Sequence, residues 1–87
     1  MKFLKLEIIG FEKHVFKKNV KFVSIKGELG SIGILPGHMP LISKTLSCEL
    51  KIIDLDNSKK LMFLSEGIIE IKFNFVTILS RNIILNL

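Results

Sequence analysis

The sequence predicts an all-β domain, folded as a sandwich or a barrel, and three observations support this. Apolar runs of about five to eight residues recur at short and regular spacing along the chain. Residues that favour turns lie between most of these runs. No segment of about 12 residues keeps a helical period, and the chain contains no alanine, the best helix former. The 87 residues suffice for one core, so we expect a single domain, residues 1–87.

The predicted strands follow from residue alternation, beginning with the N-terminal run KFLKLEII. There Leu4, Leu6 and Ile8 share one face of a strand, whereas Lys5 and Glu7 share the other, which is typical of a half-buried strand. The later runs span residues 20–26, 31–35, 41–46, 48–55, 60–65, 67–72, 75–80 and 82–87, and His14 lies in a further short charged strand.

Turn signals separate these strands. The segment DLDNSKK, residues 54–60, is predicted to be a loop because Asp, Asn and Ser side chains bond to nearby backbone amides. Asn74 stands between Phe73 and Phe75, where a tight hairpin fits, and Gly67 separates two apolar strands. These signals divide the second half of the chain into short strands joined by short turns.

The composition narrows the function classes. The hydrophobic fraction is 48% and the mean hydropathy is +0.47, so we expect a partner to cover part of the apolar surface. The net charge is +5, but the lysines are scattered and indicate little about partners. Charged or polar residues interrupt every run before the roughly 18 apolar residues of a membrane span. Cys48 is the only cysteine, and we expect its side chain to be a small buried hydrophobic group in a protein of a reducing compartment.

Residues 27–41, GELGSIGILPGHMPL, hold four of the six glycines and both prolines. Phosphate-binding loops need G-x-x-x-x-G-K-[ST] and dinucleotide folds need G-x-G-x-x-G, and neither spacing occurs here. The Leu-Pro-Gly-His segment, residues 35–38, matches a type II turn, with glycine at the position of positive φ. We therefore expect mainly structural turns, which involve Gly27, Gly33, Pro36, Gly37 and Pro40.

The same segment resembles the hallmark of the epsilon subunit family of F-type ATP synthases, G-x-x-G-x-[FLI]-G-[IV]-L-P-G-H-[AM]-P-L. Residues 65–71, SEGIIEI, are similar to the family's S-G-G-x-x-E-V segment, and residues 75–79, FVTIL, to its V-T-[IV]-L strand. The resemblance spans almost the whole chain in register. Three places depart from it: Leu-Ser-Cys at residues 46–48 replaces a Pro-Gly turn, Glu66 replaces a glycine, and Arg81-Asn82 replaces an acidic, alanine-rich segment.

The resemblance implies a flattened β-sandwich of about ten short strands. Most relatives continue as a two-helix hairpin, and because this chain stops at Leu87 we expect a short form with no C-terminal helical hairpin and no nucleotide site. The implied role is that of a non-catalytic central-stalk subunit, which links the gamma subunit to the c-ring and helps couple ion-driven rotation to ATP synthesis. Its expected place is the cytoplasmic face of a bacterial inner membrane, peripherally, through the complex.

The resemblance also assigns roles to loop residues. A loop expected to face the c-ring comprises Glu28, Leu29, Gly30 and Ser31. His38 and Met39, on the following turn, are expected to contact gamma or the c-ring, although the residues alone also allow His38 to bond a nearby backbone carbonyl. No catalytic, cofactor-binding or metal-binding residue is implied.

Two other function classes stay open. A small basic β-barrel that binds single-stranded nucleic acid would use the net charge and four strand phenylalanines. The chain has one arginine and neither tyrosine nor tryptophan, so we expect no nucleic-acid partner. We expect the four phenylalanine rings to lie in the core instead, namely Phe22, Phe63, Phe73 and Phe75. A free-standing enzyme ranks last, because no metal-ligand spacing or hydrolytic triad is recognisable.

Overall fold

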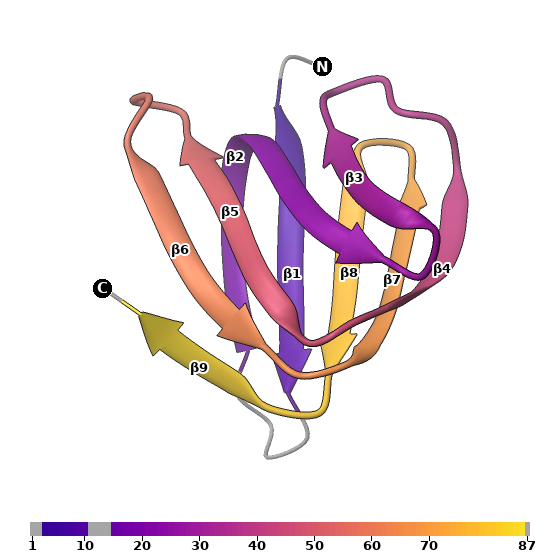
Figure 1. Cartoon of the computed structure of the whole chain (residues 1–87). Helices are drawn as coiled ribbons and strands as arrows, with labels where there is room; N and C mark the ends of the chain where they lie inside the picture. Colours follow the sequence, from indigo (N-terminus) through magenta and orange to yellow (C-terminus); the bar gives the residue numbers. More distant parts are fainter. Residues whose placement is uncertain (1–2, 11–14, 87) are drawn as a thin grey trace.

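The computed structural model describes residues 3–10 and 15–86, and these form an all-β sandwich (Figure 1). The strands are β1 (Leu4–Gly10), β2 (Val15–Gly27), β3 (Gly30–Ile34), β4 (Leu41–Thr45), β5 (Cys48–Asp54), β6 (Lys59–Leu64), β7 (Gly67–Lys72), β8 (Phe75–Ser80) and β9 (Ile83–Asn86). The predicted fold class is confirmed, and so are the predicted runs, within a few residues at their ends. Among the described residues, no helix has the length and apolar character that crossing a bilayer requires.

The long strand β2 belongs to both layers of the sandwich. Its first part pairs with β1, and its second part pairs with β3 and β5. One layer therefore has the order β2-β1-β8-β7-β4, and the other has β3-β2-β5-β6-β9. About ten strands were expected, and nine are found in the described residues. The difference arises because residues 15–19 and the predicted run at residues 20–26 form one strand, β2. His14, for which a separate short strand was expected, lies outside the described residues.

The strand β2 changes its pairing at a β-bulge between Val20 and Phe22. Such a bulge inserts one extra residue and bends the strand. Val20 is buried, and strict alternation would also turn Phe22 inward, but Val23 and Ile25 are the next buried residues. The bulge thus reverses the facing of the strand as it passes from one layer to the other, which Figure 1 shows as a curved ribbon.

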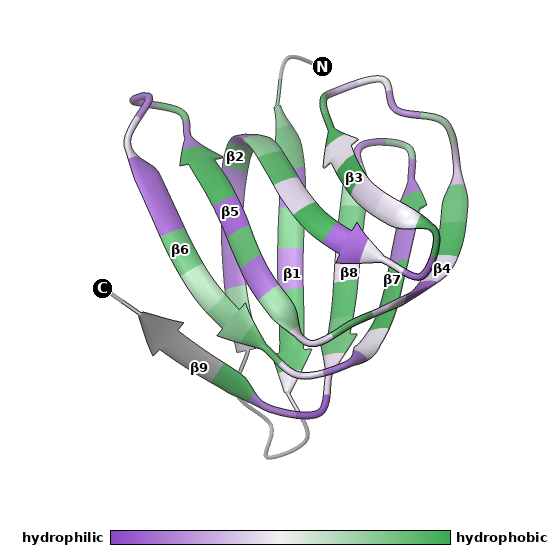
Figure 2. Ribbon diagram, in the orientation of Figure 1, coloured by the Kyte–Doolittle hydropathy of each residue, from purple (hydrophilic) through white to green (hydrophobic). Residues whose placement is uncertain are grey.

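Alternating side chains from both layers fill the core. Figure 2 shows the alternation clearly along β5, where hydrophilic and hydrophobic bands follow one another. The buried residues are Leu4, Leu6, Ile8, Val20, Val23, Ile25, Ile34, Leu50, Ile52, Met62, Leu64, Ile69, Ile71, Val76 and Ile78. The facing predicted for the N-terminal strand is confirmed, with its three aliphatic side chains inside. Cys48 is half-buried and packs against this core rather than lying fully within it.

The prediction that four phenylalanines lie in the core is wrong, because three of them are exposed and the fourth, Phe22, lies outside the core cluster. Phe63, Phe73 and Phe75 are 45%, 76% and 51% exposed, and Phe22 is half-buried. Phe63 and Phe75 occupy outward positions of β6 and β8, because their strand neighbours Met62 and Val76 face inward. Phe73 lies in a turn. Among the described residues, aliphatic side chains fill the interior, and no phenylalanine belongs to the buried core.

The predicted turns after β5 and β7 are confirmed. Phe73 and Asn74 have φ values of 50° and 64° and form a two-residue hairpin between Lys72 and Phe75. Positive φ at both central residues is the pattern of a type I′ turn, whose twist matches that of the flanking strands. In the β5–β6 turn, Asn57 has φ 71° and the Ser58 amide donates to Asp56 Oδ1 at 3.0 Å.

Gly67 marks a very close approach of two strands. It begins β7 opposite Ser80 of β8, and a Cβ atom added to it would overlap the carbonyl oxygen of Leu79. Because this obstacle is backbone, no side-chain rotation relieves it. Gly33 is the contrasting case, since a Cβ there would meet the Phe22 ring at 3.4 Å, an ordinary contact.

We expect Gly67→Ala to lower the free energy of unfolding by about 3 kcal/mol, since β7 and β8 must move apart. Gly33→Ala is the matched control and should change it by less than about 1 kcal/mol. Urea denaturation followed by circular dichroism measures both. Equal effects of the two substitutions would contradict the close approach at Gly67.

Candidate functional site

The turn between β2 and β3, residues 28–31, projects fully from the domain. Leu29 at its tip is 102% exposed, and Gly30 has φ 130°, a conformation that favours glycine. The Glu28 amide donates to the Lys44 carbonyl oxygen at 3.2 Å. This exposed turn is therefore anchored at its base to the end of β4.

A buried glycine makes the start of this turn compact. Gly27 is paired with both Gly30 and Thr45, and a Cβ added to it would lie 2.7 Å from the Ile32 Cδ1 atom. The Leu46 amide also donates to the Lys26 carbonyl oxygen at 3.0 Å. Gly27 thus leaves little room for a side chain at the base of this turn.

The predicted type II turn at residues 35–38 is present. The His38 amide donates to the Leu35 carbonyl oxygen at 3.1 Å, and Gly37 has φ 90°. The Nδ1 atom of His38 lies 2.7 Å from the Met39 carbonyl oxygen, and because a carbonyl only accepts, Nδ1 carries the proton. The backbone-bonding role that the residues allowed for His38 is confirmed. Met39 beside it is 78% exposed.

Asn74 connects this turn to the β7–β8 hairpin, a contact that the sequence did not predict. The Gly37 amide donates to Asn74 Oδ1 at 2.7 Å. The Asn74 carbonyl oxygen accepts from the Lys5 amide at 2.8 Å. One residue thus holds three segments together: the start of β1, the hairpin tip and residues 35–39, which we call the 35–39 turn. Figure 1 shows the β3–β4 and β7–β8 connections at the same end of the sandwich.

The two predicted contact regions lie at opposite ends of β3. The 28–31 turn precedes and begins this strand, whereas His38 and Met39 follow it, as Figure 1 shows. Five residues of strand span roughly 16 Å. The structure therefore does not bring the two regions into one site.

The outer face of β4, β7 and β8 carries an uncovered apolar surface, which we call the β4–β7–β8 face. Ile42, Ile68 and Leu79 point outward on neighbouring strands and are 71%, 45% and 46% exposed. A depression of about 170 Å³ lies among these three side chains, Glu70 and Thr77. A second one of about 310 Å³ adjoins it and includes Ile9 and Gly67. Contiguous exposed apolar surface is typical of interaction sites in general.

The three departures from the family hallmark meet at one end of this face. Ser47 donates to Glu66 Oε2 at 3.1 Å, and Arg81 Nη1 lies 3.5 Å from Glu66 Oε1. The pKa of Glu66 is lowered, first by a hydrogen bond from its own backbone amide and then by the Ser47 hydroxyl. Each of the three departures therefore contributes one residue to a shared set of contacts centred on Glu66.

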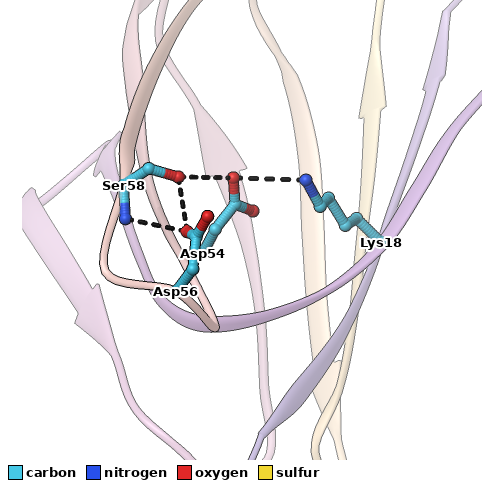
Figure 3. Close-up of polar contacts among 4 residues, drawn as sticks. All are labelled: Lys18, Asp54, Asp56 and Ser58. Carbon is cyan, nitrogen blue, oxygen red and sulfur yellow. Dashed lines mark hydrogen bonds and ion pairs between the residues drawn. The ribbon is translucent and has the colours of Figure 1, made fainter.

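A polar cluster joins β2 to the β5–β6 turn (Figure 3). Lys18 Nζ lies 3.2 Å from Asp54 Oδ2, and Asp54 is only 4% exposed. The Ser58 hydroxyl lies 3.2 Å from the same oxygen and 2.6 Å from Asp56 Oδ1. Asp54 Oδ1 is buried without a hydrogen-bond partner among the described residues. The sequence identified the turn but not the ion pair, because Lys18 lies 36 positions away.

These contacts shift two pKa values. The hydrogen bond to Asp54 raises the pKa of Lys18. The Ser58 hydroxyl, and then its backbone amide, lower the pKa of Asp56. Both shifts favour the charged forms, so the cluster is a set of paired charges. Across residues 3–10 and 15–86, no three His, Cys, Asp or Glu side chains are arranged to hold a metal ion.

The comparison with protein families matches residues 3–86 to "ATP synthase, Delta/Epsilon chain, beta-sandwich domain". The chain belongs to this family. It is also 38% identical over 77 residues to the ATP synthase epsilon chain of Bordetella petrii and 39% identical to that of Bordetella avium. Each alignment covers 88% of this chain and 55% of the relative, so the chain spans about half the length of these ATP synthase epsilon chains.

Solved structures share the fold of this epsilon-family domain. A chain in the Euglena gracilis mitochondrial ATP synthase superposes with a TM-score of 0.89 at 17% identity, covering 98% of this chain and 54% of that one. A chain in the central stalk and c-ring structure of the Tetrahymena thermophila mitochondrial ATP synthase gives a TM-score of 0.76 at 14% identity, covering 95% and 66%. The predicted membership in the epsilon family is confirmed.

We expect Asn74→Gly to free the 35–39 turn while leaving the hairpin intact, because glycine adopts positive φ but offers no side-chain acceptor. The exchange rate of the Gly37 amide proton, measured by NMR, should rise at least about tenfold, since one hydrogen bond is lost. Asn74→Asp is the control, because aspartate tolerates the same φ and keeps the acceptor. Unchanged exchange in Asn74→Gly would refute the role of the side chain.

We expect Lys18→Met to lower the free energy of unfolding more than the loss of an exposed ion pair does, because it removes the cation beside a buried carboxylate. Lys17→Met is the matched control. Lys17 pairs with Glu7 at 3.6 Å but its side chain is 71% exposed, so its loss should cost less than about 1 kcal/mol. Urea denaturation of the two variants at pH 7 compares them, and a larger effect at Lys17 would contradict this account.

Proposed function

We propose that this chain is a non-catalytic subunit of the central stalk of an ATP synthase, where it links the gamma subunit to the c-ring. It would help transmit ion-driven rotation to ATP synthesis and take no part in the chemistry. The observation that carries the proposal is the uncovered β4–β7–β8 face on a domain of the epsilon family. The subunit would lie at the cytoplasmic face of a bacterial inner membrane, peripherally, through the complex.

The β4–β7–β8 face suits the gamma subunit. Ile42, Ile68 and Leu79 offer exposed apolar area beside shallow depressions that a partner's side chains can fill. Burying apolar surface yields about 25 cal/mol per Å², and this is the main driving force of stable association. The high hydropathy of so small a domain has a physical reason if gamma covers this face.

The 28–31 turn suits the c-ring. Glu28, Leu29 and Ser31 are exposed, and the turn is short and hydrogen-bonded at its base. A contact transmits torque well only if neither partner deforms. A short, stiff turn therefore transmits torque better than a long flexible loop. Because this turn and the 35–39 turn lie at opposite ends of β3, we propose that the first meets the c-ring and that His38 and Met39 meet gamma.

Binding of single-stranded nucleic acid is the alternative, and the exposed phenylalanines favour it. Stacking platforms need free ring faces next to cationic groups. Here Lys5 Nζ lies over the Phe75 ring at 5.2 Å and Lys72 Nζ lies near the Phe73 ring at 5.9 Å. These two lysines each approach one ring face only, but the chain has one arginine and belongs to the epsilon family, so we keep the stalk role as the proposal.

We expect this chain to co-elute with the folded gamma subunit of the same organism as a one-to-one complex in size-exclusion chromatography. Ile42→Glu places a charge in the lining of the depression on the β4–β7–β8 face and should weaken the complex at least about tenfold. Leu61→Glu is the matched control on β6, in the other layer, and should leave the complex unchanged. Separate elution of the two wild-type proteins would refute the proposal.

A further inference from the structure

We propose that Phe73 is a binding anchor that inserts into an apolar recess, bordered by carboxylates, on the gamma subunit. This inference rests on the function proposed above and extends the β4–β7–β8 face to the tip of the β7–β8 hairpin. From the sequence, Phe73 was expected only to lie at a tight hairpin and to place its ring in the core. The structure confirms the turn but places the Phe73 side chain outside the core, where it is 76% exposed.

The position of Phe73 is unfavourable for the isolated domain. Its φ of 50° lies in the left-handed region, which bulky residues rarely adopt and which asparagine or glycine favour in type I′ turns. The side chain is 76% exposed, so burial does not offset this strain. Strained residues that no local interaction explains cluster at binding sites.

The surroundings hold the hairpin tip that carries Phe73 in a defined place. Asn74 is the second residue of the same turn, and its side chain accepts the Gly37 amide at 2.7 Å. This bond fixes the hairpin tip against the 35–39 turn, which carries the exposed side chains of Leu35 and Met39. Lys72 Nζ lies 5.9 Å from the centre of the Phe73 ring. A backbone that is already ordered loses little conformational freedom on binding, and an aromatic side chain has only two rotatable side-chain bonds to order.

The charge around the tip indicates the chemistry of the partner. Lys5 and Lys72 are exposed and flank Phe75 and Phe73, respectively. A second copy of this chain would bring like charges together, and the net charge of +5 adds to that repulsion. An apolar recess with carboxylates at its rim complements both the rings and the lysines.

The rigidity of the tip favours a protein over a lipid surface. A membrane accepts an apolar side chain in many orientations, so it does not require two hydrogen-bonded turns to hold each other. A protein recess has one shape and rewards a fixed ring. Phe73 also adjoins the β4–β7–β8 face, because Lys72 and Phe75 end the outward rows of β7 and β8. One partner can therefore cover both.

The test compares Phe73→Asn with wild type in heat stability and in affinity for the purified gamma subunit, measured by biolayer interferometry. Asparagine suits the first position of a type I′ turn, so the melting temperature should rise by about 4 °C or more. The dissociation constant should increase at least about tenfold. Leu55→Asn is the matched control, since Leu55 is 47% exposed in the β5–β6 turn, and it should bind as wild type does.

Each other outcome contradicts a particular step. Wild-type affinity in Phe73→Asn overturns the anchor and leaves the stalk role standing. A lower melting temperature in Phe73→Asn overturns the argument from strain. No binding of gamma by the wild-type chain overturns the proposed function and the anchor's partner together. Self-association, or binding to vesicles of phosphatidylglycerol, that Phe73→Asn abolishes while gamma binding persists would assign the tip to that other occupant.

Discussion

The hydrogen bonds of β2 hold the two layers of this domain together, and the other features depend on them. The strand pairs first with β1 and then, after the bulge between Val20 and Phe22, with β3 and β5. The reversal of facing at the bulge lets both halves of the strand direct aliphatic side chains into one shared core. The same strand ends at Gly27, so it also sets the position of the exposed 28–31 turn.

Besides the buried core, many large apolar side chains of this domain lie on its surface. Outward positions of β4, β7 and β8 carry Ile42, Ile68 and Leu79, and alternation alone would put polar residues there. At one end of this face, the departures from the family hallmark form contacts among Ser47, Glu66 and Arg81. The negative charge of Glu66, which stands where the family has a glycine, is thereby paired with Arg81. This end of the face is therefore polar, and its charges have partners.

The strand pattern was readable because side chains in a strand alternate with a period of two. Nine predicted runs correspond to strands, and the turns at residues 35–38, 54–60 and 73–74 follow from the conformational preferences of Pro, Gly, Asn and Asp. The family was recognisable because such preferences, in a fixed order, make a specific hallmark. Local chemistry therefore determined the elements, the turn types and the family.

Only the tertiary structure decided where the facing of β2 reverses and which loops meet. The bulge in β2 turned Phe22 away from the core, and alternation cannot reveal an extra residue. Pairing of Lys18 with Asp54, and of Asn74 with Gly37, joins positions 36 and 37 residues apart. Lysine, aspartate, asparagine and glycine occur at many positions, so their residue types do not reveal which of them will meet. The way the strands cross and stack decides that. Sequence thus determined the local conformations, and packing determined the surface they present.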